Sequence, residues 1–196
     1  MAVLISLLLP ALNKARRQAR MVACQSNLRQ FGLAFEMYVS TYNGSLPIPR
    51  DFSLQDETYH YWYTMLSERI LPMGTRWESG RVWVCPEAVT EPQDKNLTWS
   101  GWATYAMNAE FNEYRRKTSI RGSAEGFLLA DSQVAYRITI NQYATDMSFR
   151  HGGDPNKRVN ILYFDGHVAA LAYGQIPPIS DMYQANWNRF WRPWLK

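Results

Sequence analysis

The sequence predicts an α+β fold, in which one long N-terminal helix packs on a C-terminal antiparallel β-sheet. Two observations carry this prediction. Between residues 11 and 42, apolar residues recur at three- and four-residue steps, with Gly32 the one glycine and no proline. After residue 80, short aliphatic, aromatic and β-branched runs alternate with Gly, Pro, Asn and Asp, the pattern of strands and turns.

A short apolar segment, MAVLISLLLPAL, precedes a basic cluster between Lys14 and Arg20. Residues 1–12 are apolar except for Ser6 and Pro10. Spanning a bilayer takes about 20 apolar residues, so this segment is too short to cross one unaided. It also lacks the preceding basic residues and the cleavage site of a secretory signal. We expect Pro10 to kink or weaken the helix, because proline lacks an amide proton and clashes with the preceding turn.

Turn signals divide the rest of the chain. The Asn43-Gly44 pair is expected to end the first helix, and a second helix is expected over residues 59–70. Asp165 and Gly166 lie between two apolar runs, which predicts a β-hairpin with a two-residue type I′ turn. The predicted strand segments are RVWVC, WATYAMN, GFLLAD, AYRITI, NILYF and HVAALA.

Length and composition allow one folded domain with an extension. The 196 residues are 46% hydrophobic and 14% aromatic, which suffices for an ordinary core. We predict an N-terminal helix over residues 1–43, with residues 1–12 projecting and the remainder packed on a globular head formed by residues 44–196. A projecting apolar segment is typical of a binding site for another protein or a membrane.

Several residues are candidates for metal or acid–base chemistry. His151, Asp154, Asp165 and His167 surround the predicted hairpin, and Asp131 ends an earlier strand. Carboxylates and imidazoles can hold a metal ion, and Ca²⁺ at Asp131, Asp154 or Asp165 is one possibility. The second possibility is structural: Asp165 serves the turn, Asp131 caps a strand or loop, and His151 pins a long loop. No nucleophile–base spacing is present, so we predict no catalytic residue and no enzyme.

The net charge of +4, the aromatic segments and the two cysteines each allow two interpretations. The basic cluster fits either an anionic partner or a solvated helix face, and it lacks the interleaved aromatics typical of nucleic-acid binding. The segment YHYWYTM and the tail, with Trp187, Trp191 and Trp194 at helical steps, fit either a sugar-stacking platform or core packing. Cys24 and Cys85 can be a disulfide or two reduced thiols, and their spacing matches no zinc motif.

Two segments resemble bacterial type IV pilin-like proteins, particularly the planctomycete and verrucomicrobial set with prepilin-type N-termini. LLLPALNKARRQARMVACQSNLRQFGLAFEMYVSTYNGSLP resembles their N-terminal helix. FRHGGDPNKRVNILYFDGHV resembles their His-X9-Asp-Gly signature, carried here by His151, Asp165 and Gly166, with DPNK as an insertion that lengthens the spacing. No Gly-Phe-Thr-Leu-Ile-Glu processing site precedes AVLISLLLP, so we expect the chain to start inside the family helix.

The resemblance implies a structural subunit of a type IV pilus-like or type II secretion pseudopilus filament that polymerises through its helix. Its implied partners are other pilin or pseudopilin subunits, the prepilin peptidase and assembly machinery, and the inner membrane before assembly. The implied location is the bacterial cell envelope, with a periplasmic or extracellular head. The implied assembly residues are Val3, Leu4, Leu7, Leu8, Pro10 and Leu12.

Three further expectations follow. An envelope location favours a Cys24–Cys85 disulfide that staples the helix to the sheet. Related major pseudopilins use calcium to order a C-terminal loop, which gives a calcium site at the aspartates a precedent. Two more function classes compete with the filament subunit: a surface or tip module that binds carbohydrate or DNA, and a metal-dependent hydrolase at His151 and Asp165.

Overall fold

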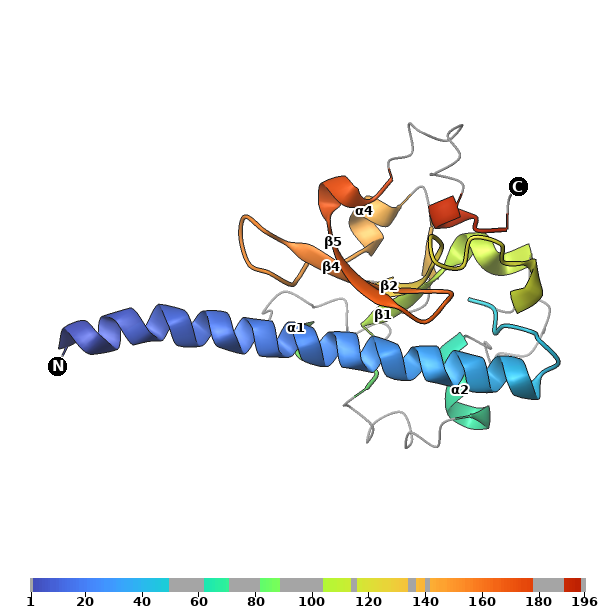
Figure 1. Ribbon diagram of the computed structural model, residues 1–196, viewed down its shortest axis with the longest axis horizontal. Coiled ribbons are helices and arrows are strands. Elements are labelled where there is room, and N and C mark those ends of the chain that lie inside the picture. Colours follow the sequence, from blue (N-terminus) through green and yellow to red (C-terminus); the bar gives the residue numbers. More distant parts are fainter. Residues whose placement is uncertain are drawn as a thin grey trace.

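A computed structural model of the chain confirms the α+β fold (Figure 1). The long helix α1 (Ala2–Thr41) lies along a five-stranded sheet, and its N-terminal part extends beyond the head. The structure describes residues 2–49, 62–70, 82–88, 104–113, 116–133, 137–139, 142–177 and 189–194.

Helix α1 is continuous from Ala2 and ends where the sequence predicts. Pro10 lies inside it, and the helical backbone continues through the proline. At the other end, Asn43 has a φ of 52° and Gly44 a φ of 78°. The Gly44 amide donates a hydrogen bond to the Val39 carbonyl (2.8 Å), which closes the helix with a left-handed turn.

One side of α1 forms the main core together with the sheet and helix α2 (Trp62–Arg69). We call this side the inner stripe; its buried residues are Cys24, Leu28, Phe31, Phe35 and Tyr38. They recur at three- and four-residue steps, so they share one helical face. The Phe31 ring contacts those of Trp62, Trp83 and Tyr105 at centroid distances of 4.9–5.6 Å. Helix α2 confirms the second predicted helix, while residues 59–61 lie outside the described part.

The sheet has the order β3-β1-β2-β4-β5. Neighbouring strands are antiparallel except β1 and β3, which are parallel, so the sheet is mostly antiparallel, with one parallel pair at its β3 edge. The chain reverses direction after β2. Strand β3 then pairs with β1 on the side away from β2, so β3 runs in the same direction as β1. The strands are β1 (Tyr105–Asn108), β2 (Phe127–Asp131), β3 (Arg137–Ile138), β4 (Arg158–Tyr163) and β5 (Val168–Ala172).

A sixth predicted strand, RVWVC, is not a strand over its described residues 82–85, which form a turn and bend. Trp83 and Cys85 are buried in the core instead. The segment makes two hydrogen bonds to Thr104: the Thr104 amide donates to the Trp83 carbonyl (3.0 Å), and the Cys85 amide donates to the Thr104 hydroxyl (2.6 Å). These anchor it beside the sheet without a ladder.

The opposite side of the sheet carries a second core. The short helix α4 (Tyr143–Asp146) and the C-terminal turn 189–194 contribute to it. Trp191 is fully buried there, and Trp194 is buried in the first core, as expected for a tail that packs its rings on the head. Trp187 lies outside the described residues. The 3₁₀ turns are η2 (Ala109–Glu113), η3 (Lys117–Ser119) and η4 (Tyr173–Gln175).

The β4–β5 hairpin is confirmed, but its turn is not the predicted two-residue type I′. The Tyr163 amide donates to the His167 carbonyl (2.9 Å), which leaves three residues in the loop. A type I′ turn needs a positive φ at both central residues, whereas here Gly166 alone is positive, at 90°. The first loop residue, Phe164, is buried against Phe111, and this packing favours the longer loop.

Replacing Gly166 by alanine should lower the free energy of unfolding by about 1–2 kcal/mol, the cost of a left-handed backbone for a residue with a Cβ. No atom lies within 4 Å of the Cβ position, so the effect isolates the backbone. Gly174→Ala is the matched control, because Gly174 has the same open surroundings and no positive φ. Urea denaturation of both variants measures the difference. Equal losses would contradict the assignment of the strain to Gly166.

Candidate functional site

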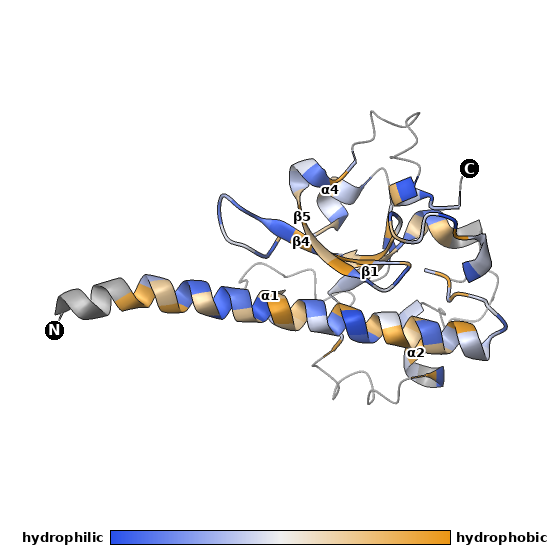
Figure 2. Cartoon of the chain, viewed as in Figure 1, coloured by the Kyte–Doolittle hydropathy of each residue, from blue (hydrophilic) through white to orange (hydrophobic). Residues whose placement is uncertain are grey.

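The projecting part of α1 is the first candidate site. Every described side chain from Leu8 to Ala19 is exposed, with Leu8 at 66% and Leu12 at 47%. Figure 2 shows hydrophobic residues near the helix tip, followed by a mostly hydrophilic section. Of the predicted assembly residues, Leu8, Pro10 and Leu12 are therefore exposed. The side chains of Val3, Leu4 and Leu7 lie outside the described part.

Apolar side chains also recur along the outer side of α1, in two parts separated by the exposed polar residues Ser26 and Gln30. A helix advances about 100° per residue, so seven apolar positions between Leu8 and Met37 lie within about 40° of one line along the helix, roughly opposite the inner stripe. All of them are exposed, and Leu33 and Met37 remain so (67% and 52%) beside the head. We call them the outer stripe: Leu8, Leu12, Ala15, Ala19, Val22, Leu33 and Met37.

The basic cluster lies on other sides of the same helical section. Lys14, Arg16 and Arg17 are exposed, and Arg20 forms an ion pair with Glu87 of the head (3.5 Å). No helix among the described residues combines the length and apolar character needed to cross a membrane.

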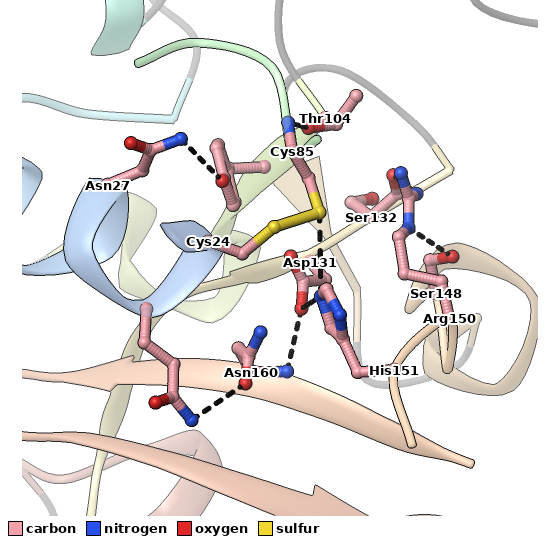
Figure 3. A network of polar contacts seen from close by, with 12 residues as sticks. Cys24, Asn27, Cys85, Thr104, Asp131, Ser132, Ser148, Arg150, His151 and Asn160 are labelled. Atoms are coloured by element: carbon pink, nitrogen blue, oxygen red, sulfur yellow. Dashed lines mark hydrogen bonds and ion pairs between the residues drawn. A yellow bond between two sulfur atoms is a disulfide. The ribbon is translucent and has the colours of Figure 1, made fainter. Parts of the chain in front are cut away.

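The second candidate site lies where α1 enters the head (Figure 3). Cys24 and Cys85 form a disulfide with their Cα atoms 5.2 Å apart, which confirms the predicted pair. Cys24 is the first residue of the inner stripe, and both cysteines are fully buried. The bond therefore joins α1 covalently to the segment 82–88 at the point where the helix becomes buried.

Asp131 and His151 meet at this disulfide. Asp131 ends β2, and His151 lies in the loop before β4, where its backbone pairs with Arg158. The His151 Nε2 atom is 3.1 Å from Asp131 Oδ2 and 3.5 Å from Cys85 Sγ. The Asn160 amide of β4 donates a 2.7 Å hydrogen bond to the same Asp131 oxygen. Five parts of the chain thus place polar or sulfur groups at one buried point: α1, the segment 82–88, β2, the loop before β4, and β4 itself (Figure 3).

The remaining predicted site residues lie elsewhere. Asp131, at the end of β2, lies beside Asn160 near the start of β4. Asp165 follows the other end of β4 and pairs with His167 (2.6 Å). Asp154 has an 82% exposed side chain beside Lys157. The structure therefore does not bring the three aspartates of the predicted calcium site together. The sequence analysis missed the grouping of His151 with Asp131 and both cysteines, because the four positions are scattered along the chain and converge only through the fold.

The surroundings of the cluster are buried and polar. Burial, and then the neighbouring Asp131 carboxylate, raise the pKa of Tyr105 well above its ordinary value. The Tyr105 hydroxyl accepts a hydrogen bond from the Asn27 amide (3.3 Å) on α1. Arg150 is also buried and donates to the Ser132 carbonyl (2.7 Å) and the Ser148 hydroxyl (2.8 Å). The helix–sheet junction thus contains a hydrogen-bonded polar network within an apolar core.

Comparison with known proteins finds a match to a family model. A family model described as SBP_bac_10, protein of unknown function (DUF1559), matches residues 13–73. This part contains the basic cluster, the inner stripe and α2. Neither a curated protein nor a solved structure matches the chain. The match does not extend to the C-terminal hairpin, so the His-X9-Asp-Gly resemblance stays a prediction.

Removing the disulfide should lower the free energy of unfolding by about 3–4 kcal/mol, because the bond closes a long loop in the unfolded chain. The cysteines are 61 positions apart. The test is urea denaturation of a Cys24→Ser, Cys85→Ser double variant, with Ser26→Ala on an exposed position of the same helical turn as the control. A double variant as stable as the parent would show that the bond does not stabilise the junction.

Proposed function

We propose that this chain is a structural subunit of a type IV pilus-like or type II secretion pseudopilus filament, and that it polymerises through α1. The observation that carries the proposal is the outer stripe. It starts on the projecting part of the helix and continues beside the head, and all its side chains are exposed. Exposed apolar side chains gathered on one side of a helix are typical of a protein contact.

The shape of the molecule supports repeated contacts between copies. The head leaves the outer stripe exposed, so these side chains are available to a partner outside the subunit. A helix that is apolar on two opposite sides can pack on its own head and on the helix of a neighbour at once. When such a contact joins different surfaces of two copies and does not close into a ring, it produces a helical filament.

The comparisons and the aromatic residues agree with this proposal. The matching family is compatible with a pilin-like surface protein, and its match covers the junction between helix and head. In the two aromatic segments that could have formed a sugar-binding platform, Trp62, Trp191 and Trp194 are buried in the cores. Their rings stabilise the head, which supports a structural subunit over a carbohydrate-binding module.

On this proposal the partners are other pilin or pseudopilin subunits and their assembly machinery, including a prepilin peptidase. The subunit is attached to the inner membrane before assembly, and the head faces the periplasm or the exterior. The chain acts by polymerising and has no catalytic turnover.

The outer stripe can be tested with charged substitutions. The parent chain, purified in detergent, should form filaments when the detergent is removed, whereas Leu12→Asp combined with Val22→Asp should leave it monomeric. The two aspartates would place charges inside the contact between helices, where their desolvation is costly. Negative-stain electron microscopy and sedimentation velocity distinguish the two states.

Asn13→Asp combined with Gln18→Asp is the matched control, because it adds the same two charges to exposed helix positions at least about a quarter turn away from the centre of the outer stripe. It should assemble like the parent chain. A parent that stays monomeric, or a double variant that still forms filaments, would refute assembly through this stripe. Circular dichroism should show equal helix content for all three proteins.

A further inference from the structure

We infer that the reduced chain binds one Zn²⁺ ion through Cys24, Cys85, Asp131 and His151. One sulfur, nitrogen or oxygen atom from each of these side chains lies within 4.8 Å of the others, and all four residues are buried. Two thiolates, an imidazole and a carboxylate form a ligand set suited to zinc. The inference is independent of filament assembly, since the cluster lies inside one head.

The sulfur-to-nitrogen distance already matches a tetrahedral zinc site. Zinc binds sulfur at about 2.3 Å, imidazole nitrogen at about 2.0–2.1 Å and carboxylate oxygen at about 2.0–2.2 Å. For a tetrahedron these lengths place sulfur about 3.5 Å from nitrogen, and nitrogen about 3.4 Å from oxygen. The observed distance from Cys85 Sγ to His151 Nε2 is 3.5 Å. That nitrogen is 3.1 Å from Asp131 Oδ2, which accepts the hydrogen bond from the Asn160 backbone amide, so Oδ1 is the carboxylate oxygen left for zinc.

Two buried atoms of the cluster lack the hydrogen bonds expected of them. Among the described residues, Asp131 Oδ1 and His151 Nδ1 have no hydrogen-bond partner, although Asp131 is 0% and His151 1% exposed. Buried polar atoms normally have partners, so each exception calls for an explanation. A metal ion would supply a partner for Asp131 Oδ1, while Oδ2 keeps its hydrogen bond from the Asn160 backbone amide. Zinc bound at His151 Nε2 leaves Nδ1 without a partner, so of the two unpartnered atoms only Oδ1 points to a bound metal.

Reduction of the disulfide and binding of Zn²⁺ balance in atoms and charge. A phosphine and one water molecule reduce the disulfide to two thiols, and the phosphine becomes its oxide. The two sulfur atoms then separate to about 3.8 Å, the sulfur–sulfur edge of a zinc tetrahedron. Zn²⁺ replaces the two thiol protons, and neutral His151 binds through Nε2 with its proton on Nδ1. The complex carries one net negative charge, and the cationic Arg150 is buried in the same network (Figure 3).

Zinc binding and the disulfide therefore exclude each other, because both use the sulfur atoms of Cys24 and Cys85. Both join α1 to the segment 82–88, and zinc additionally binds the end of β2 and the loop before β4. A reducing environment favours the metal, and an oxidising one favours the covalent bond.

Cobalt titration of the full chain tests this inference. After reduction with a phosphine, the chain should bind one Co²⁺ ion and show a sulfur-to-cobalt charge-transfer band together with the visible bands of tetrahedral cobalt. Zn²⁺ should displace the cobalt and raise the Tm of the reduced chain. The oxidised chain should show neither the bands nor the rise in Tm, because its sulfur atoms are bonded to each other.

Two variants separate a four-ligand site from two thiols acting alone. His151→Ala and Asp131→Asn should each weaken zinc binding at least about tenfold, since even residues that only support ligands contribute this much. His167→Ala is the control, because His167 lies with Asp165 at the other end of β4. Circular dichroism of the reduced variants reports their fold, and zinc-dependent folding of the reduced parent also supports the site.

A reduced parent chain without the charge-transfer band would overturn the inference. So would variants at His151 and Asp131 that both bind zinc as tightly as the parent, because the two thiols alone would then account for the metal. Filament formation is measured separately, so either proposal can fail while the other stands.

Discussion

The burial of the inner stripe of α1 is the constraint on which the rest of the structure depends. This stripe supplies one wall of the main core, and the sheet, α2 and the segment 82–88 supply the others. The aromatic ring of Phe31 lies at the centre, against Trp62 and Trp83. Because these elements are far apart in the sequence, the helix is what holds them in one core.

The same constraint explains why α1 presents two different surfaces. Up to Ala19 every described side chain is exposed, and from Cys24 onward one side is buried while the other is not. Leu33 and Met37 thus remain in solvent directly across the helix from the core. A helix used only to complete the head would have polar residues at these positions, so their apolar character favours a role beyond the head.

The sequence predicted the elements well where periodicity or turn chemistry determined them locally. The spacing of the inner stripe predicted α1, and Asp165-Gly166 predicted a hairpin. The type of that turn depends on the burial of Phe164 in the core, which no local pattern reveals. The same limit applies to the buried cluster: Asp131 was recognised at a strand end, but its contact with His151 arises from the strand order and register.

The position of the Cys24–Cys85 bond has a mechanical consequence. A pull on the projecting part of α1 along its axis reaches its first buried helix residue at Cys24, one turn after the ion pair between Arg20 and Glu87. The tension therefore reaches a covalent link before it shears the apolar packing behind it. The helix therefore passes load first to the segment 82–88, which is held beside the sheet by its two hydrogen bonds with Thr104.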